Sequence, residues 1–252
     1  MFDIHCHMLP AVDDGADSLE TACAMARAAA ADGVRAVILT PHCSVPGARF
    51  YLLPEQILDR TAQFQAELFE RDIRLDVLPG AEVLATSDFP SLFVRGEYLT
   101  LNRSRYFLVE FAFEEDPAFT LYIVETIASA GLIPVIAHPE RYFFVYRVPD
   151  LLQDWRRLGA LLQINKGSLS GRFGEDARYT ATRLLTGQRA SLIASDAHGV
   201  SRRTPILSHC QKAVEKLCGT AYSKELFVRM PARILDDLPP DFRKPPAKEE
   251  AT

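Results

Sequence analysis

Imidazole and carboxylate side chains fall at the ends of short apolar segments in this sequence. His5 and His7 close the first segment two residues apart, so in a strand both side chains would point to one face. The corresponding positions after later segments hold the same two kinds of residue: His42, Glu82, Glu110, His138, Asp196 and His198. Asp14, in the loop after the first segment, adds another carboxylate. Imidazole and carboxylate together are the ligand mixture of Zn, Mn and Fe sites, so the residue types predict a divalent-metal centre.

A cluster of this kind requires a compensating cation. Carboxylates and imidazoles brought together at one place would repel and desolvate one another without added positive charge. A single histidine or glutamate at a strand end is more often a helix cap or a satisfied polar group. Nine such residues are difficult to explain in that way, and they exceed the ligands that one ion needs. Two or three ions are therefore the expected number.

Seven apolar segments, with helical patterns between them, would position these side chains. The expected strands are Phe2–His7, Ala36–Thr40, Arg74–Glu82, Tyr106–Glu110, Ile133–His138, Leu161–Asn165 and Ser191–Ser195. Most are continuous apolar runs, as expected for parallel strands buried on both faces. The expected helices are Ser18–Asp32, Pro54–Arg71, Ala118–Ala130, Pro149–Leu158, Glu175–Thr186 and Pro205–Leu217. Repeated strand–helix units predict an α/β fold with a mostly parallel sheet. In a barrel of such units the carboxyl ends of the strands converge on one rim, where active sites lie.

Length and composition fit a single domain. The chain has 252 residues, 48% hydrophobic and 24% charged, which excludes a disordered, collagen-like or membrane-spanning protein. One α/β barrel would use nearly all of this length. We expect residues 1–237 to form that domain. Residues 238–252 are rich in proline, lysine and glutamate and predict a solvated, flexible tail.

The charge and the apolar runs exclude two further classes. With 33 acidic and 28 basic residues the net charge is -5, which argues against a general nucleic-acid binder. The longest apolar runs, Val34–Leu39 and Leu132–Ala137, are too short for stable membrane insertion. The N-terminus lacks a basic or apolar leader region, and the five cysteines have no regular spacing. We expect free thiols and a cytoplasmic location.

Several short motifs resemble the PHP (polymerase and histidinol phosphatase) superfamily and occur in its order. They are His5-Cys6-His7, Val12-Asp13-Asp14-Gly15, Thr40-Pro41-His42, Gly80-Ala81-Glu82, Glu110, His138-Pro139-Glu140-Arg141 and Ser195-Asp196-Ala197-His198. The second and sixth favour the branch of bacterial manganese-dependent protein-tyrosine phosphatases of capsule and exopolysaccharide loci. The resemblance covers about residues 1–235.

The resemblance implies a fold and a set of ligands. The fold is a distorted (β/α)7 barrel, the PHP fold, with three divalent ions, Mn²⁺ in the first place and Fe or Zn as alternatives. By this resemblance one ion is held by His5, His7, Glu82 and Asp196. A second is held by Glu82, Glu110 and His138, and the third by Asp14, His42 and His198.

The reaction implied is hydrolysis of a phosphomonoester. Two close metal ions lower the pKa of a bound water, so that a hydroxide can attack phosphorus in line near neutral pH. Arg141 and Arg203 match family arginines near the phosphate, and Glu110 is expected among the catalytic residues. The guanidinium fork can pair two phosphate oxygens at once. Arg202 precedes Arg203, so which of the two reaches the site stays open at this point.

The resemblance also implies a substrate and a partner. The substrate class is phosphotyrosine in a protein, and the expected partner is the tyrosine-rich tail of a bacterial polysaccharide-assembly kinase. The cellular role would be regulation of capsule or exopolysaccharide synthesis.

Three alternatives compete with this interpretation. His42, Cys43 and Arg49 have the His-Cys-x5-Arg spacing of phosphatases that use a cysteine thiolate. Pro46 removes an amide donor from that loop, and Phe50 stands where those enzymes have Ser or Thr, so we expect Cys43 to be incidental. A histidinol-phosphate phosphatase of the same fold would share the metals. A non-catalytic PHP module would act as a binding partner, although such modules often lose ligands that are all present here.

Overall fold

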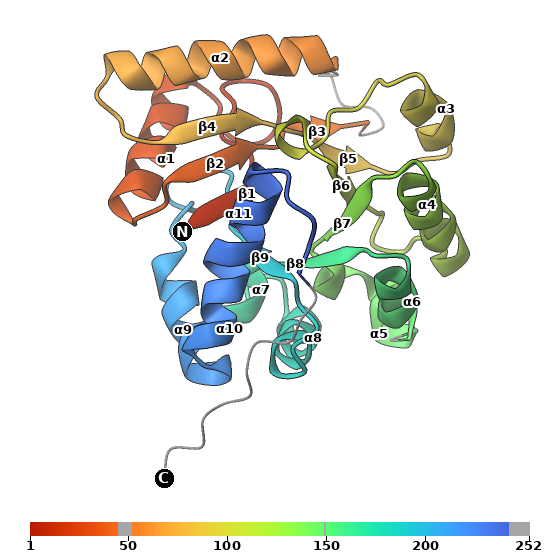
Figure 1. The fold of residues 1–252 in the computed structure, drawn as a ribbon. Coiled ribbons are helices and arrows are strands. Elements are labelled where there is room, and N and C mark those ends of the chain that lie inside the picture. The colour runs from red at the N-terminus through yellow and green to blue at the C-terminus, as the bar shows by residue number, and fades with distance from the viewer. Residues whose placement is uncertain (45–51, 149, 242–252) are drawn as a thin grey trace.

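Parallel strands alternate with helices along the chain in the computed structural model, which describes residues 1–44, 52–148 and 150–241 (Figure 1). The strands are β1 (Phe2–Cys6), β2 (Ala36–Leu39), β3 (His42–Cys43), β4 (Asp76–Pro79), β5 (Glu82–Leu84), β6 (Tyr106–Glu110), β7 (Ile133–Ala137), β8 (Leu161–Asn165) and β9 (Leu192–Ala194). They form two sheets, of order β1-β2-β4 and β3-β5-β6-β7-β8-β9, in which every pairing is parallel.

The two sheets are parts of one closed ring. β3 continues β2 after Thr40-Pro41, and β5 continues β4 after Gly80-Ala81, so two strand lines run from the three-stranded sheet into the six-stranded sheet. At the far edge β1 is joined to the end of β9, because His7 N–H donates to Ala197 O (2.9 Å) and Asp196 N–H donates to the His5 carbonyl (2.9 Å). Seven strand lines therefore enclose the interior, and the predicted distorted (β/α)7 barrel is confirmed. The expected strand Arg74–Glu82 differs, because it is divided between β4 and β5.

Helices cover the outside of this ring (Figure 1). The helices up to β9 are α1 (Leu19–Ala31), α2 (Pro54–Glu70), α3 (Phe89–Val94), α4 (Pro117–Ser129), α5 (Phe143–Arg147), α6 (Leu151–Arg157), α7 (Lys166–Leu169) and α8 (Glu175–Thr186). After β9 come α9 (Ser208–Cys218), α10 (Thr220–Lys224), η3 (Glu225–Arg229) and α11 (Met230–Leu235). Two short turns, η1 (Leu101–Arg103) and η2 (Pro139–Arg141), precede β6 and follow β7. All six expected helices are present, with ends shifted by up to three residues.

The start of α1 differs from the pattern expected for it. The expected helix begins with Ser18, but the side chain of Ser18 is the cap, accepting from Thr21 N–H at 3.2 Å. The spacing of Asp17 and Glu20 predicts a capping box, but Asp17 instead accepts from the hydroxyl groups of Ser18 and Thr21. Pro149, the expected first residue of another helix, lies outside the described residues.

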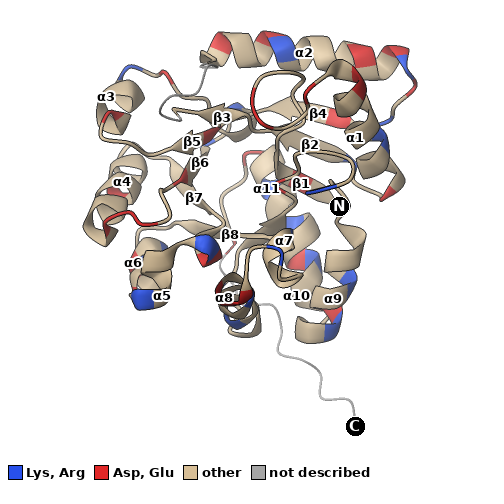
Figure 2. Ribbon diagram, turned by 180° about the vertical axis from the view of Figure 1, so that it is seen from behind, with Lys and Arg blue, Asp and Glu red and all other residues tan. Residues whose placement is uncertain are grey.

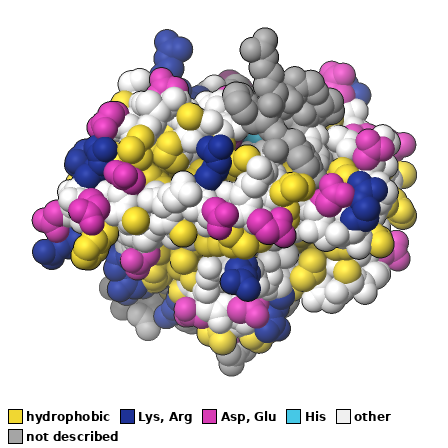
Figure 3. Space-filling view, turned by 90° about the horizontal axis from the view of Figure 1, so that it is seen from above, with side chains coloured by type: hydrophobic (Ala, Val, Ile, Leu, Met, Phe, Trp, Pro, Cys, Tyr) yellow, Lys and Arg dark blue, Asp and Glu magenta, His cyan; other side chains and the backbone are white. Residues whose placement is uncertain are grey.

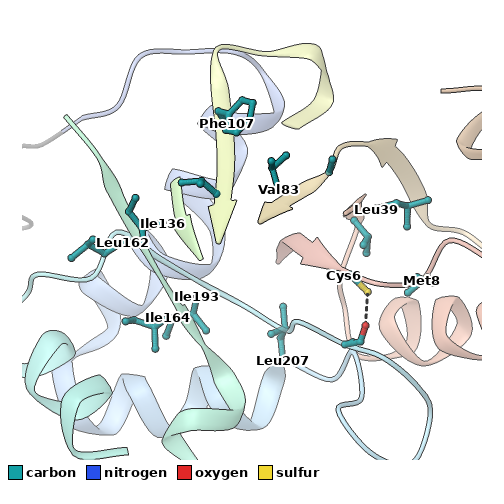
Figure 4. Close-up of a cluster of buried hydrophobic side chains, with 14 of the residues drawn as sticks. Cys6, Met8, Leu39, Val83, Phe107, Ile136, Leu162, Ile164, Ile193 and Leu207 are labelled. Atoms are coloured by element: carbon teal, nitrogen blue, oxygen red, sulfur yellow. Dashed lines mark hydrogen bonds between the residues drawn. The ribbon is translucent and has the colours of Figure 1, made fainter. Parts of the chain in front are cut away.

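The barrel interior holds a compact apolar cluster. Every strand line except β4/β5 contributes a buried side chain to it, including Ile4, Ile38, Leu108, Val135, Leu161 and Leu192. Met230 and Ile234 of the last helical segment complete the cluster, so α11 closes the end opposite the carboxyl ends of the strands. A second layer lies between strands and helices (Figure 4), where the Cys6 thiol points to the Ala197 carbonyl at 3.9 Å.

Replacing Ile234 by alanine is expected to destabilise the chain by about 2–5 kcal/mol, because the side chain is fully buried and its loss leaves a cavity at the barrel end. Urea unfolding followed by circular dichroism measures this. The matched control is Val94→Ala, whose side chain is 84% exposed and should change the free energy of unfolding by less than about 0.5 kcal/mol. Equal effects of the two substitutions would show that α11 does not seal the interior.

The first residues of the predicted tail contact the barrel. Tyr106 donates its hydroxyl proton to the Leu238 carbonyl (2.5 Å), and Arg233 donates to Pro239 O (2.8 Å). Residues 242–252 of that prediction lie outside the described residues. Among the helices that the structure describes, none is both long and apolar enough to span a bilayer.

Candidate active site

Four buried side chains from the predicted set converge where the ring closes. The Nε2 atoms of His5 and His7 lie 3.2 Å apart. Glu82 Oε2 is 3.1 Å from the first and 3.2 Å from the second, and Asp196 Oδ1 is 3.6 and 3.5 Å from them. All four residues are at most 1% exposed. The strand ends therefore place two imidazoles and two carboxylates around one point.

A second group adjoins the first through Glu82. His138 Nε2 lies 3.1 Å from Glu82 Oε1 and 3.4 Å from Glu110 Oε1. His42 Nδ1 lies 3.2 Å from Glu82 Oε2 and 3.9 Å from Glu110 Oε2. One buried carboxylate thus touches four imidazoles, which makes Glu82 the centre of the whole cluster.

The third group lies on the more open side. Asp14 Oδ1 is 3.2 Å from His198 Nε2 and 3.5 Å from His42 Nε2, and the rings of His7 and His198 lie 3.9 Å apart. The structure therefore brings together all nine residues singled out in the sequence. The groupings differ slightly from those expected: ligand atoms of His7 join Asp14, His42 and His198, and ligand atoms of His42 join Glu82 and Glu110.

Two members of the cluster have unusual backbone conformations. His138 (φ 31°, ψ 55°) and Asp196 (φ 47°) are both in the left-handed region, which residues with a side chain rarely adopt. Each follows directly on the end of a strand or lies within two residues of it, where the chain turns away from the barrel. Such strain persists only where surrounding contacts enforce it, and it concentrates at functional sites.

The donor atoms fit metal ions better than they fit one another. His42 Nδ1 and His198 Nε2 each lie 3.2 Å from a carboxylate oxygen, yet neither makes a hydrogen bond with a described residue. Buried polar atoms are normally hydrogen-bonded. Nitrogens and oxygens that converge without bonding are the arrangement expected around a divalent cation.

Two positioning residues hold the imidazoles in orientation. His5 Nδ1 lies 2.8 Å from Gln163 Oε1, and His7 Nδ1 lies 2.8 Å from Asp13 Oδ2. Each contact fixes a proton on Nδ1 and leaves Nε2 to face the cluster, as in many metal sites. Asp13 also accepts from the backbone N–H groups of His42 (3.0 Å) and Gly15 (3.0 Å). Sequence reasoning missed Gln163, although a glutamine inside an apolar strand was a usable signal.

The cluster shifts the pKa values of its members strongly. Burial and Arg141 lower the pKa of His138, but hydrogen bonds to Glu110 and Glu82 outweigh them and raise it to about 9. Burial likewise lowers the pKa of His7, while Asp13 and Glu82 raise it to a value well above its usual range. Both imidazoles are therefore positively charged at neutral pH, with a proton on each ring nitrogen. A metal ion must displace one proton from each ring to bind there.

The two predicted arginines lie beside Asp196. Arg141 Nη1 is 3.5 Å from Asp196 Oδ2, and its guanidinium lies 4.1 Å from the ring of Phe173 and 5.0 Å from that of Phe113. Arg203 donates from Nη2 to Asp196 Oδ1 and from Nε to the Asp196 carbonyl (3.2 Å). The side chain of Arg202 is exposed, so the structure places Arg203 at the site. The two phenylalanines were not expected from sequence.

The alternative mechanism with a cysteine nucleophile requires a reactive thiol, and Cys43 does not provide one. Cys43 is 2% exposed, and burial raises its pKa to about 11. A nucleophilic cysteine needs a lowered pKa. Pro46, Arg49 and Phe50 lie outside the described residues.

Charged residues of both signs surround the strand ends and also occupy the helices (Figure 2). On the face seen in Figure 3, basic and acidic side chains are interspersed among apolar ones. The densest group of ionisable side chains described above is therefore the buried cluster at the strand ends.

A family model for capsular polysaccharide synthesis, CpsB/CapC, matches residues 1–236. The chain belongs to this CpsB/CapC family. It is 37% identical over 214 residues to the tyrosine-protein phosphatase YwqE of Bacillus subtilis, covering 85% of this chain and 82% of the relative. The resemblance inferred from the motifs is thus confirmed.

Solved structures agree with the family assignment. One chain from crystal structures described as those of YwqE from Bacillus subtilis and CpsB from Streptococcus pneumoniae, unique metal-dependent tyrosine phosphatases, matches at TM-score 0.89 and 34% identity, over 100% of this chain and 100% of the other. A histidinol phosphate phosphatase from Lactococcus lactis, solved with zinc, L-histidinol and phosphate, matches at TM-score 0.55 and 15% identity, over 86% of this chain and 92% of the other. The second likeness shows a shared fold only.

Proposed function

We propose that this CpsB/CapC family member is a metal-dependent phosphatase that hydrolyses phosphotyrosine in proteins. The observation that carries the proposal is the buried carboxylate of Glu82 among four imidazoles, with two arginines beside the same cluster. Imidazoles and carboxylates would hold the ions, and the arginines would hold a phosphate. The reactions named for the similar YwqE and CpsB proteins support the same choice.

The proposed ligands form three sets. His5, His7, Glu82 and Asp196 hold one divalent ion, Glu82, Glu110 and His138 hold a second, and Asp14, His42 and His198 hold a third. Mn²⁺ is the proposed metal, with Fe or Zn as alternatives that the same donor atoms accept. When bound, such ions supply positive charge to the phosphate and acidify water, so that a nucleophile is available near neutral pH.

The chain's own residues bind and orient the substrate. Arg141 and Arg203 neutralise and hold phosphate oxygens, and the rings of Phe113 and Phe173 fix the Arg141 guanidinium in place. The carboxylate of Glu110 is 14% exposed, more than that of Glu82. We assign Glu110 a part in the reaction, together with the two arginines.

The cellular role follows from the family. We propose that the substrate is the tyrosine-rich tail of a bacterial polysaccharide-assembly kinase. The reaction would take place in the cytoplasm. Dephosphorylation of that tail would regulate capsule or exopolysaccharide synthesis.

A comparison of substrates tests the proposed reaction. The chain with added Mn²⁺ is assayed with a phosphotyrosine peptide, a phosphoserine peptide and histidinol phosphate, and kcat/KM should be largest for the first. The Cys43→Ser variant should keep its activity, because the thiol holds its proton and is buried. If histidinol phosphate is hydrolysed faster than the phosphotyrosine peptide, the proposed substrate class is wrong and the proposed active site still stands. Loss of activity with Cys43→Ser would contradict the metal mechanism.

Replacing Asp13 by asparagine is expected to weaken Mn²⁺ binding about 10- to 100-fold, because asparagine cannot orient His7 as the carboxylate does. Isothermal titration of the metal-free chain measures the affinity. Asp17→Asn is the matched control, since Asp17 lies in the same loop and, among the described residues, its carboxylate accepts side-chain hydrogen bonds from Ser18 and Thr21. An unchanged Mn²⁺ affinity in the Asp13→Asn variant would show that Asp13 does not position His7 for metal binding.

A further inference from the structure

A cavity lies beside the phosphate-binding arginines and is not used by the proposed reaction. It has a volume of about 340 Å³ and is bounded by the start of α7, the chain that links α7 to α8, the segment after Arg203, and α9. Its walls include Leu169, Phe173, Ile206 and Ala213. A cavity of this size lies within the range that holds a side chain or a small ligand.

Two residues belong to both the cavity and the candidate active site. Arg203 lines the cavity and bonds Asp196, and Phe173 lines the cavity while its ring lies 4.1 Å from the Arg141 guanidinium. The Phe173 ring is also 6.0 Å from the Arg203 guanidinium. A substrate whose phosphate binds at the two arginines would therefore have neighbouring atoms at the mouth of this cavity.

The charged side chains that line the cavity are basic. Arg172, Arg203, Lys166 and His209 line it, and no acidic residue occurs among the described lining residues. Lys166 is not available to a ligand, because its ammonium group donates to the carbonyls of Thr204 and Ile206 (2.7 Å to the latter). Those bonds instead fix the segment that carries Arg203.

Arg172 is the basic side chain that is free to recognise a ligand. It is exposed, and it forms no ion pair with any residue that the structure describes. The carboxylate nearest in sequence, Glu175, is paired with Arg178. An unpaired guanidinium at the edge of a cavity with apolar and basic walls is complementary to a carboxylate on a short aliphatic stem.

We propose that this cavity is a substrate subsite that binds an acidic side chain, Asp or Glu, adjacent to the phosphotyrosine, with Arg172 as the recognising group. The inference rests on the proposed function, because it names the residue that flanks the same phosphotyrosine. Recognition at a distance from the reacting phosphate contributes equally to the bound and the transition state, so it lowers KM and leaves kcat unaltered.

Peptides that differ in one flanking residue test the subsite. Phosphotyrosine peptides carrying Glu, Gln or Lys at each neighbouring position are assayed with the Mn²⁺-loaded chain. At one position the wild type should prefer Glu over Lys by about tenfold in kcat/KM, mainly through KM. The Arg172→Gln variant should lose the preference, and Arg172→Glu should reverse it.

Controls separate the subsite from the reaction. Arg74→Glu makes the same charge change at a residue that is 92% exposed and precedes β4, so it should keep the wild-type Glu-to-Lys ratio. Wild-type hydrolysis of free O-phosphotyrosine, which has no neighbouring residues, reports on the proposed function alone. If all peptides are hydrolysed without charge preference, or the preference persists in Arg172→Glu, the subsite is refuted and the proposed function stands. If no phosphotyrosine substrate reacts, both are refuted.

Discussion

Replacement of Glu82 by glutamine is expected to reduce hydrolysis of a phosphotyrosine peptide by about 10³-fold or more. Its carboxylate lies within 3.2 Å of nitrogen atoms of His5, His7, His42 and His138, and it is 1% exposed. Glutamine keeps the size of the side chain but removes the negative charge and one acceptor oxygen. Two of the proposed ion sets share this residue, so one would lose its ligand oxygen and the other would keep only a neutral amide oxygen. A coupled assay for released phosphate measures the effect.

The same substitution at an exposed position controls for the loss of charge. Glu67→Gln on α2, where the carboxylate is 46% exposed, should keep nearly full activity. Thermal unfolding of both variants shows whether they are folded, and the shorter Glu82→Asp provides a second charged variant if the glutamine variant is not. Activity within tenfold of wild type in a folded Glu82→Gln chain would exclude Glu82 as the shared ligand.

Removal of divalent ions is expected to abolish the activity, and added Mn²⁺ should restore it. The restoring concentration should also depend on pH. Because His138 has a pKa raised to about 9 and must lose its proton to bind a cation, affinity should rise between about pH 6.5 and 9. The half-saturating Mn²⁺ concentration, measured by activity after chelation and dialysis, should therefore fall as the pH increases. A half-saturating concentration that does not change with pH would contradict proton displacement.

The part of this architecture that repeats along the chain was predictable from sequence. Buried parallel strands have continuous apolar sequences, such as residues 133–137. The residues that directly follow these strands are polar and are therefore easy to identify in the sequence. The convergence of His5, Glu82 and Asp196 from positions far apart in sequence follows from barrel geometry alone. The motif order then narrowed the possibilities to one family.

The remainder depended on contacts that a local pattern does not contain. Phe113 and Phe173 are ordinary apolar residues in sequence, and only the fold brings both rings to Arg141. Ser18, and not the adjacent Asp17, caps α1. Both residues have side chains that can cap a helix, so their types alone do not decide which one does. The sequence likewise could not distinguish Arg202 from Arg203. In the structure the backbone of Arg203 has φ 47°, and its side chain bonds Asp196.

Ions bound by the histidine and carboxylate cluster are proposed to give this chain its phosphotyrosine phosphatase activity. A titration of the metal-free chain with Mn²⁺ tests this requirement. Bound metal, by elemental analysis, and hydrolysis of a phosphotyrosine peptide are measured on the same samples. We predict no hydrolysis without metal, and activity that appears as two or more ions bind per chain. Full hydrolysis by a chain that holds fewer than one ion would show that the cluster acts without bound metal.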